Sequence, residues 1–233
     1  MLFVIDFDGT LSLRDSVDAL LERHAPSEWL AIEAEWAQGR ITAKECMRRQ
    51  IRMITGNEEQ LERFFETIRL DPTFLPFLNY VQKFAQVAII SDGIGRAIHA
   101  ALEAAGFPGI PVFANHLSFL NGTWELDFPN SDVNCAVGSG VCKCAVARDL
   151  SGTSAQPVVL IGDGRSDMCL AGHADYVFAK ESLARHCEAE AIPFSEFLSF
   201  SDILASIKNW PDRNGLPILE SMPKRSKLNG ITR

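Results

Sequence analysis

The chain has 233 residues and a net charge of −8, with 47% hydrophobic and 22% charged residues. This length and composition are typical of one large folded domain, or of a core with a small insert, and they exclude a disordered chain. The acidic balance argues against nucleic-acid binding, although it is compatible with a small anionic substrate held through a metal ion.

The sequence also predicts no membrane partner and a cytoplasmic location. No run is long and apolar enough to span a bilayer, and the N-terminal apolar stretch, residues 2–5, is too short for a signal peptide before it ends at Asp6. In that compartment the cysteines are expected to be reduced. They are Cys46, Cys135, Cys142, Cys144, Cys169 and Cys187.

The first predicted strand, residues 2–5, is followed by Asp6, Asp8 and Gly9. Carboxylates two residues apart in an extended segment lie on one side of the backbone, and the glycine lets the chain turn sharply away. Because such carboxylates repel each other, the pattern predicts that a cation holds them or that one keeps a proton. By itself the segment also fits an ordinary strand end with solvated aspartates.

Residues 13–72 predict a small helical bundle inserted between the first two strands. Apolar residues recur there at helical spacing, and Thr42, with Glu45 three residues later, predicts a helix start of the capping-box type. The block has no strand candidate. We expect Trp29 and Trp36 to pack in the core of this bundle.

A second buried strand is predicted over residues 87–90, after a helix that begins near residue 72. It ends in Ser91-Asp92-Gly93, and a helix follows over residues 94–105. A hydroxyl and backbone N–H groups at a strand-to-helix turn suit a phosphate group. The same three residues are also a common turn sequence.

The middle of the chain predicts a short strand over residues 112–113 and then a β-hairpin. The hairpin strands, residues 117–119 and 124–126, flank Asn121-Gly122, which is a strong turn signal. His116 lies just before the hairpin. It is interpreted as a hydrogen-bonded structural histidine, the alternative being that it lines the pocket.

A polar loop over residues 131–140 leads to Lys143 at the start of a helix, and a buried strand over residues 158–161 ends in an acidic turn with Asp163 and Asp167. The remaining predicted elements are a strand over 175–178, helices over 181–189 and 195–207, and a loosely held tail over 211–233.

Short apolar strands that alternate with helices predict an α/β fold with a doubly wound parallel sheet. The predicted domains are a core of residues 1–12 and 73–210, a helical cap of residues 13–72, and the tail. In such sheets the reactive groups lie at the carboxyl ends of the strands. Five polar residues follow predicted strands at that edge: Asp6, Asp8, Ser91, Asp163 and Asp167.

The polar motifs resemble, in order, the four motifs of the haloacid dehalogenase superfamily of phosphatases and phosphotransferases. They are Asp6/Asp8, Ser91, Lys143 and Asp163/Asp167. The resemblance implies a Rossmann-like core with a helical cap. It also implies a phosphatase for a small phosphorylated metabolite, in which Asp6 is the nucleophile that forms an aspartyl-phosphate, Asp8 the general acid and base, and Lys143 the counter-charge.

The resemblance further implies a Mg²⁺ site and a phosphate site. The metal would be bound by the side chains of Asp6 and Asp163 and by the backbone carbonyl of Asp8, while Asp167 would act from behind them or through a water molecule. The phosphate would be held by the Ser91 hydroxyl and by backbone N–H groups. The residues expected to bind it are Ser91, Asp92, Gly93 and Gly9.

The helical block occupies the cap position of the phosphoserine-phosphatase-like branch. Residues 25–29 and 115–119 and the cysteine-flanked Lys143 resemble the 2-hydroxy-3-keto-5-methylthiopentenyl-1-phosphate phosphatases of methionine salvage. Two positions depart from that family, which usually has Ser-Gly-Gly where this chain has Ser91-Asp92-Gly93, and proline where it has Cys144.

Phosphoserine is the less favoured substrate. Its phosphatases clamp the amino acid with a cap glutamate and a cap arginine, and this chain has Asp15 and Gln50 at those places. Glutamine lacks the forked donor that suits a carboxylate. One of three arginines on a predicted solvated helix face would have to substitute for it. They are Arg48, Arg49 and Arg52.

Three other interpretations remain open on the sequence. The same scaffold fits a phosphotransferase or mutase. A non-enzymatic regulator could accept phosphate on Asp6, although an acid/base at Asp8 argues against a long-lived phosphate there. The cysteines at 135, 142 and 144 could hold zinc if His116 supplied a fourth ligand.

Overall fold

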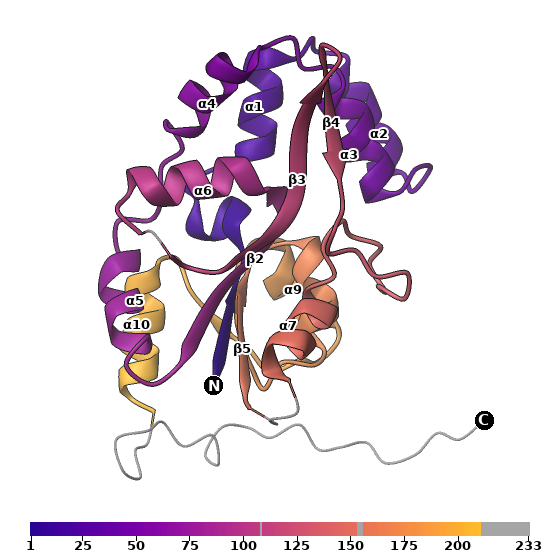
Figure 1. Ribbon diagram of the computed structural model, residues 1–233. Coiled ribbons are helices and arrows are strands. Elements are labelled where there is room, and N and C mark those ends of the chain that lie inside the picture. The colour runs from indigo at the N-terminus through magenta and orange to yellow at the C-terminus, as the bar shows by residue number, and fades with distance from the viewer. Residues whose placement is uncertain (108, 153–155, 211–233) are drawn as a thin grey trace, which may run out of the picture.

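The computed structural model describes residues 1–107, 109–152 and 156–210, so the predicted tail lies outside the described residues. One sheet has the strand order β4-β3-β2-β1-β5-β6-β7, and every neighbouring pair is parallel except β3 and β4 (Figure 1). The strands are β1 (Leu2–Ile5), β2 (Gln86–Ile94), β3 (Val112–Leu120), β4 (Thr123–Asp127), β5 (Val158–Gly162), β6 (Tyr176–Ala179) and β7 (Ser195–Glu196).

Helices cover both faces of this sheet. Phe3 and Ile5 of β1 pack with the first layer, and Leu2 and Val4 pack with the second, because successive side chains of a strand point to opposite faces. The first layer contains α5 (Phe74–Val81), α6 (Gly95–Ala104) and α10 (Phe200–Lys208). The second contains α7 (Lys143–Ser151), α8 (Met168–Ala171) and α9 (Glu181–Ala189). The expected doubly wound α/β sheet is confirmed.

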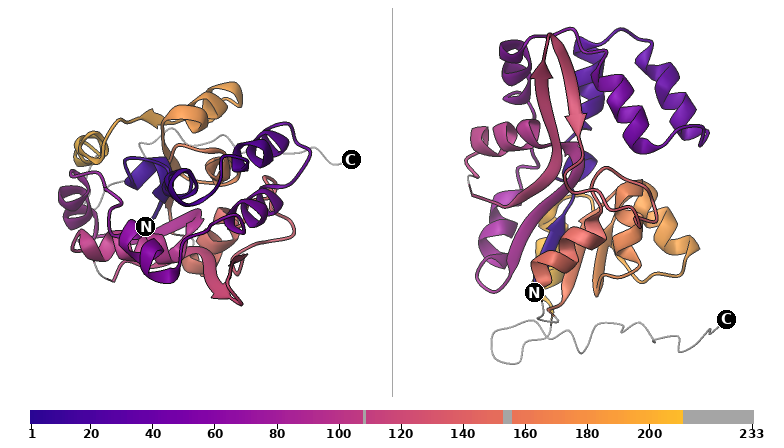
Figure 2. Two further views of the ribbon diagram at one scale, coloured as in Figure 1. Left: turned by 90° about the horizontal axis from the view of Figure 1, so that it is seen from above. Right: turned by 45° about the vertical axis from the view of Figure 1, so that its right-hand side comes forward.

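Four further helices form the inserted bundle above the carboxyl edge of the sheet (Figures 1 and 2). They are α1 (Ser16–His24), α2 (Trp29–Ala37), α3 (Ala43–Ile51) and α4 (Glu58–Phe65). The starts of α1, α3 and α4 follow from local sequence, since Asp15, Thr42 and Asn57 each accept a backbone N–H of the first turn. The predicted boundaries of this block, residues 13–72, stay a prediction.

The bundle packs on the β3–β4 hairpin as well as on itself. Trp124 of β4 is buried in a core shared with the bundle, and its indole N–H donates to the Gly56 carbonyl at 2.7 Å. The hairpin turn has positive φ at Asn121 (52°) and Gly122 (83°), as the sequence predicts. The hairpin therefore supports the inserted helices from the core side.

Several predicted boundaries are wrong. β2 continues to Ile94 instead of ending at residue 90. β3 is one strand, not two, because its first half pairs with β2 and its second half with β4. The helix predicted over residues 195–207 starts at Phe200, after the short strand β7 and a capping box at Ser199.

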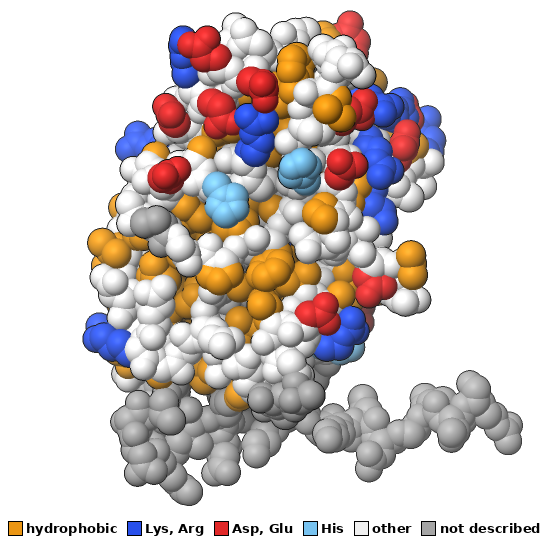
Figure 3. All heavy atoms as spheres, viewed as in Figure 1, with side chains coloured by type: hydrophobic (Ala, Val, Ile, Leu, Met, Phe, Trp, Pro, Cys, Tyr) orange, Lys and Arg blue, Asp and Glu red, His pale blue; other side chains and the backbone are white. Residues whose placement is uncertain are grey.

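Charged side chains are concentrated over the bundle and hairpin on the face shown in Figure 3, and they are sparser over the lower sheet. Exposed ion pairs of the chain include Arg14 with Glu22 and Arg63 with Glu59. Pairs of this kind contribute little to stability. Among the described residues, no helix has the length and apolar character needed to cross a membrane.

Candidate active site

Asp6 and Asp8 lie where β1 ends, at the centre of the sheet between β2 and β5. The turn that follows, Phe7–Leu11, departs from helical geometry at Asp8 and Gly9, and Gly9 has a φ of +71°. A Cβ at Gly9 would lie 2.6 Å from Oδ2 of Asp163. Glycine is therefore required by the backbone angle and by the close approach of a second acidic segment.

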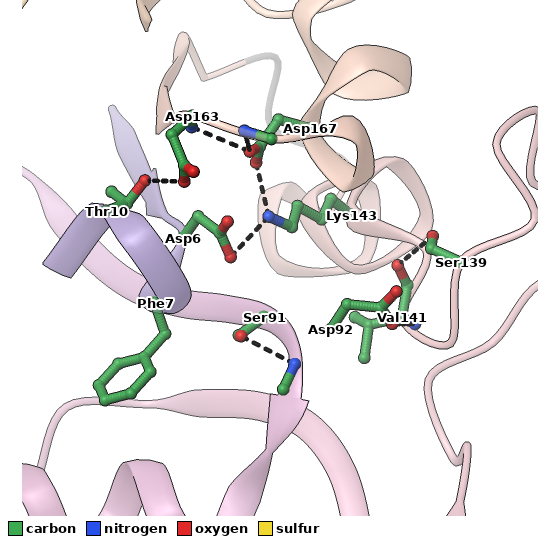
Figure 4. A network of polar contacts seen from close by, with 12 residues as sticks. Asp6, Phe7, Thr10, Ser91, Asp92, Ser139, Val141, Lys143, Asp163 and Asp167 are labelled. Atoms are coloured by element: carbon green, nitrogen blue, oxygen red, sulfur yellow. Dashed lines mark hydrogen bonds and ion pairs between the residues drawn. The ribbon is translucent and has the colours of Figure 1, made fainter. Parts of the chain in front are cut away.

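Lys143, the first residue of α7, connects the acidic segments. Its buried ammonium lies 2.8 Å from Oδ1 of Asp6 and 2.5 Å from Oδ1 of Asp167 (Figure 4). Burial acts to lower the pKa of Lys143, but the charges of Asp167 and Asp6 raise it above its ordinary value. The lysine is thus a permanent cation between two carboxylates.

Asp163 and Asp167 belong to the loop after β5. Both oxygens of Asp167 are occupied, because Oδ1 accepts from Lys143 and Oδ2 accepts the backbone N–H groups of Asp163 and Gly164 at 3.2 and 3.1 Å. Oδ1 of Asp163 accepts the Thr10 hydroxyl at 2.5 Å. These bonds attach the loop to both the lysine and the turn after β1.

Asp8 is directed away from this ion pair. Its Oδ1 accepts the N–H of Ser16 at 2.8 Å and the Ser16 hydroxyl at 2.5 Å. Burial and the charge of Asp15 raise the pKa of Asp8 to about 8, against the effect of the two Ser16 bonds. At neutral pH this carboxyl is therefore mostly protonated and can donate a proton.

The Ser91-Asp92-Gly93 motif lies near the end of β2. The Ser91 hydroxyl accepts the Gly93 N–H at 3.0 Å, and a Cβ on Gly93 would overlap the Asp8 carboxylate. The side chain of Asp92 instead accepts the N–H of Val141 at 2.8 Å. Asp92 thus holds the loop that leads into Lys143 (Figure 4).

The motifs surround a cavity of about 260 Å³ between the sheet edge and the inserted helices. Lys143, Asp167 and Gly9 lie behind its wall, in contact with residues that form it. From the core the wall includes Asp6, Asp8, Ser91, Asp92, Gly93, Asp163, Gly164, Arg165 and Ser166. From the inserted helices it includes Asp15, Val17, Asp18, Glu33, Trp36, Ala43, Cys46, Met47 and Gln50.

The acidic residues fit a hard divalent cation. Asp6, Asp163 and Asp167 offer oxygens that all lie within 4.8 Å of one another. Burial and the charge of Asp167 raise the pKa of Asp6 well above its ordinary value, and burial, opposed by Thr10, raises that of Asp163 to about 6. A single ammonium therefore leaves this oxygen-only cluster with excess negative charge, which suits Mg²⁺. The side chain of Asp8 lies outside this group.

Arg165 and Trp36 are among the cavity residues that the sequence did not predict. The Arg165 guanidinium lies 5.4 Å from the ring centroid of Trp36, so the loop after β5 contacts α2 across the cavity. Trp36 is thus a cavity residue, and its predicted place in the bundle core is wrong, whereas Trp29 is buried as expected. The sequence feature that could have identified Arg165 as a cavity residue is its position between Asp163 and Asp167 in the acidic turn.

The three arginines considered as partners for a substrate carboxylate are occupied elsewhere. Arg49 pairs with Glu35 at 2.8 Å, and Arg52 pairs with Glu125 at 2.8 Å. The Arg48 guanidinium lies over the Phe128 ring at 4.7 Å. Among the described cavity residues, Arg165 is the cationic one.

The alternative zinc grouping of His116 with the cysteines at 135, 142 and 144 does not form among the described residues. His116 is exposed on β3 and lines a separate hollow beside α6, away from the acidic cavity. Cys144 instead lies close to Cys169 and His173. His116 is on β3 and Cys144 is on α7, and these two elements do not bring their side chains together. Sequence spacing does not reveal this separation.

Curated relatives match most of the chain. A 2-hydroxy-3-keto-5-methylthiopentenyl-1-phosphate phosphatase from Exiguobacterium sp. is 31% identical over 209 residues, covering 88% of this chain and 96% of the relative. A protein of the same name from Geobacillus kaustophilus is 28% identical over 207 residues, covering 87% and 93%.

A solved structure described as a phospho-aspartyl intermediate analogue of phosphoserine phosphatase matches with a TM-score of 0.66 at 18% identity, covering 88% of this chain and 97% of that one. A likeness at this identity supports the fold. The sequence model of the haloacid dehalogenase-like hydrolase family matches residues 3–172. These residues contain all four polar motifs. The expected family and fold are confirmed, and the chain belongs to the haloacid dehalogenase-like hydrolases.

Proposed function

We propose that the protein is a Mg²⁺-dependent phosphomonoesterase that hydrolyses a small phosphorylated metabolite through a phosphorylated Asp6. One observation carries this proposal: the Lys143 ammonium lies between Asp6 and Asp167 beside a cavity that also receives Asp8 and Ser91. A nucleophile, an acid, a phosphate-binding hydroxyl and a counter-charge thus meet at one place.

The first step transfers the phosphoryl group to Asp6. Its Oδ1 pairs with Lys143, whereas Oδ2 has no hydrogen bond among the described residues. Oδ2 forms a bond to phosphorus as the bond from phosphorus to the alcohol oxygen breaks, and protonated Asp8 gives its proton to that oxygen. Asp8 then takes a proton from water, which attacks phosphorus, releases phosphate and restores Asp6.

The surrounding residues hold the phosphoryl oxygens. The Ser91 hydroxyl, whose oxygen accepts the Gly93 N–H, would donate to them, and Lys143 would offset their charge. The side chains of Asp6 and Asp163 and the carbonyl of Asp8 would hold Mg²⁺, with Asp167 behind them. When bound, the metal supplies further positive charge to the phosphoryl oxygens.

Residues 13–72 act as the cap, because α1, α2 and α3 contribute the wall opposite the strand ends. A cap that covers the cavity excludes water from the reacting phosphoryl group. The Trp36–Arg165 contact is one point where this cap meets the core. A cytoplasmic location remains part of the proposal.

The cap wall favours a substrate whose alcohol part has no carboxylate. Gln50 donates its amide to Oε2 of Glu33 at 2.8 Å, and Asp15 and Asp18 add further acidic groups beside it. The inserted helices add carboxylates and no arginine to this wall, and the cationic cavity residue, Arg165, lies over the Trp36 ring. A substrate carboxylate beside Gln50 would therefore lose its hydration among other carboxylates.

The same wall offers apolar surface to the end of the substrate. Val17, Trp36 and Met47 line it. A phosphate ester with an uncharged thioether tail, such as the compound named in the curated relatives, matches that surface. We propose 2-hydroxy-3-keto-5-methylthiopentenyl-1-phosphate as the substrate, ahead of phosphoserine.

Steady-state kinetics on both esters with Mg²⁺ tests this choice. The thioether ester should exceed phosphoserine in kcat/KM by at least about 100-fold, because a buried carboxylate without a partner is strongly rejected. The double variant Gln50→Arg with Glu33→Gln should narrow that ratio by raising kcat/KM for phosphoserine. Equal kcat/KM values in the unmodified protein would refute the substrate assignment while leaving the phosphatase mechanism intact.

A further inference from the structure

A second group of potential metal ligands lies beside the acidic site but outside its cavity. Sγ of Cys144 and Sγ of Cys169 are 2.8 Å apart, and an imidazole nitrogen of His173 completes a group whose ligand atoms all lie within 4.8 Å of one another. None of the three residues lines the acidic cavity or belongs to the four polar motifs. Their proximity therefore has no role in the proposed hydrolysis.

Local structure holds these ligands in place. Cys144 is the second residue of α7, and Cys169 lies in α8. The chain continues its turn after α8, since the N–H groups of His173 and Ala174 both donate to Leu170 at 2.8 Å. Residues four apart on such a turn lie on one side, so Cys169 and His173 face Cys144 together.

The donor set differs in chemistry from the carboxylate cluster. Two thiols and an imidazole suit Zn²⁺ and similar thiophilic ions, whereas an oxygen-only set suits Mg²⁺. Burial and the neighbouring Cys169 raise the pKa of the Cys144 thiol, so the metal-free site holds a protonated thiol. A divalent metal ion that binds both sulfurs would displace two protons as two metal–sulfur bonds form.

We propose that Cys144, Cys169 and His173 form a binding site for a thiophilic divalent metal ion, with Zn²⁺ as the representative ion. Tetrahedral coordination with bonds of about 2.3 Å places two sulfurs almost 4 Å apart, so the thiol side chains rotate apart by about 1 Å on binding. The three protein ligands leave one position for water.

This site would tie α7 to α8 next to the catalytic ion pair. Cys144 follows Lys143 directly, and Cys169 lies two residues after Asp167. A metal that joins the two cysteines therefore joins the backbones that carry the 2.5 Å contact between Lys143 and Asp167. The site stabilises the folded chain because the ligands are separated in the unfolded one.

Cobalt titration of the full chain tests the proposal. The protein is kept reduced with a phosphine and in excess Mg²⁺, and Co²⁺ is added while the ultraviolet and visible spectra are recorded. We expect a thiolate-to-cobalt charge-transfer band, strong d–d bands typical of tetrahedral coordination, and the loss of both on adding Zn²⁺. Zn²⁺ should also raise the thermal unfolding midpoint.

Three variants locate the site. Cys144→Ser, Cys169→Ser and His173→Ala should each weaken Zn²⁺ binding by about tenfold or more. Because His173 is exposed, its replacement by alanine should leave the fold intact. Cys187→Ala and His99→Ala remove a thiol and an imidazole outside the proposed site. These control variants should bind Zn²⁺ as tightly as the unmodified protein.

Two results would overturn the proposal: no charge-transfer band in the reduced protein, or a band that persists unchanged in both the Cys169→Ser and His173→Ala variants. Neither result bears on phosphate-ester hydrolysis, because that activity is measured separately with Mg²⁺. The metal site and the phosphatase assignment therefore fail independently.

Discussion

The polar partners of the buried carboxyl groups Asp6 and Asp8 decide which chemical role each can take. Asp6 and Asp167 share the Lys143 ammonium, whereas Asp8 is bonded to Ser16 and has a pKa raised to about 8 by burial and Asp15. Two carboxyl groups two residues apart thus have different partners, the Lys143 ammonium at Asp6 and the hydroxyl and N–H of Ser16 at Asp8. Such a difference separates a nucleophile from an acid.

Asp6→Asn should reduce hydrolysis of p-nitrophenyl phosphate by at least about 10⁴-fold, because an amide oxygen is a poor nucleophile. The rate is measured with saturating Mg²⁺. Asp149→Asn, the same change on an exposed carboxylate of α7, serves as the control and should keep the unmodified rate. An active Asp6→Asn enzyme would exclude an aspartyl-phosphate on this residue.

Asp8→Asn should slow hydrolysis of an alkyl phosphate by about 10²–10⁴-fold. The loss should be smaller for p-nitrophenyl phosphate, since nitrophenolate leaves without a proton. In the unmodified enzyme, kcat for the alkyl ester should fall as the pH rises through about 8, where Asp8 loses its proton. Equal losses for both esters, with an unchanged pH profile, would contradict the role of Asp8 as the acid.

At the scale of elements, the β3–β4 hairpin links the inserted helices to the sheet. Arg52 of the segment after α3 pairs with Glu125 of β4, and Arg96 of α6 pairs with Glu62 of α4. These pairs are partly exposed and weak. The buried indole of Trp124 and its bond to Gly56 give the stronger connection.

Trp124→Phe should lower the free energy of unfolding by about 1–3 kcal/mol, because the buried Gly56 carbonyl loses its donor. Urea denaturation followed by circular dichroism measures the change. Trp29→Phe is the matched control, since that indole is also buried in the bundle but makes no hydrogen bond among the described residues. An equal loss in both variants would assign the effect to ring volume alone.

At the scale of the whole molecule, four segments far apart in the sequence meet at one edge of the sheet. β1, β2 and β5 are neighbours, and α7 brings Lys143 to their carboxyl ends. The bundle covers this edge (Figure 2). The cavity therefore depends on the strand ends and the inserted helices together.

Chelation with EDTA should abolish hydrolysis, and added Mg²⁺ should restore it, because one lysine does not neutralise the carboxylate cluster. In Asp163→Asn, half-maximal activity should require at least about tenfold more Mg²⁺. Activity as a function of Mg²⁺ concentration measures both effects. Full activity in EDTA would rule out the metal requirement.

Much of the fold was predictable because its signals are local. The apolar runs of β1 and β5, the helix cap at Thr42 and the turn at Asn121 each depend on neighbours within a few residues. The boundaries of β2 and β3 were wrong because distant strands continue the pairing past polar residues. Tertiary pairing overrides local preference there.

The sequence by itself determined the order of the polar motifs, their places at strand ends and helix starts, and the α/β class, since each follows from short-range pattern. Only the tertiary structure decided that Arg165 meets Trp36, that Glu33 takes the amide of Gln50, and that Cys144 lies with Cys169 and His173. Such contacts join residues on different elements, and their distances are set by how those elements pack together.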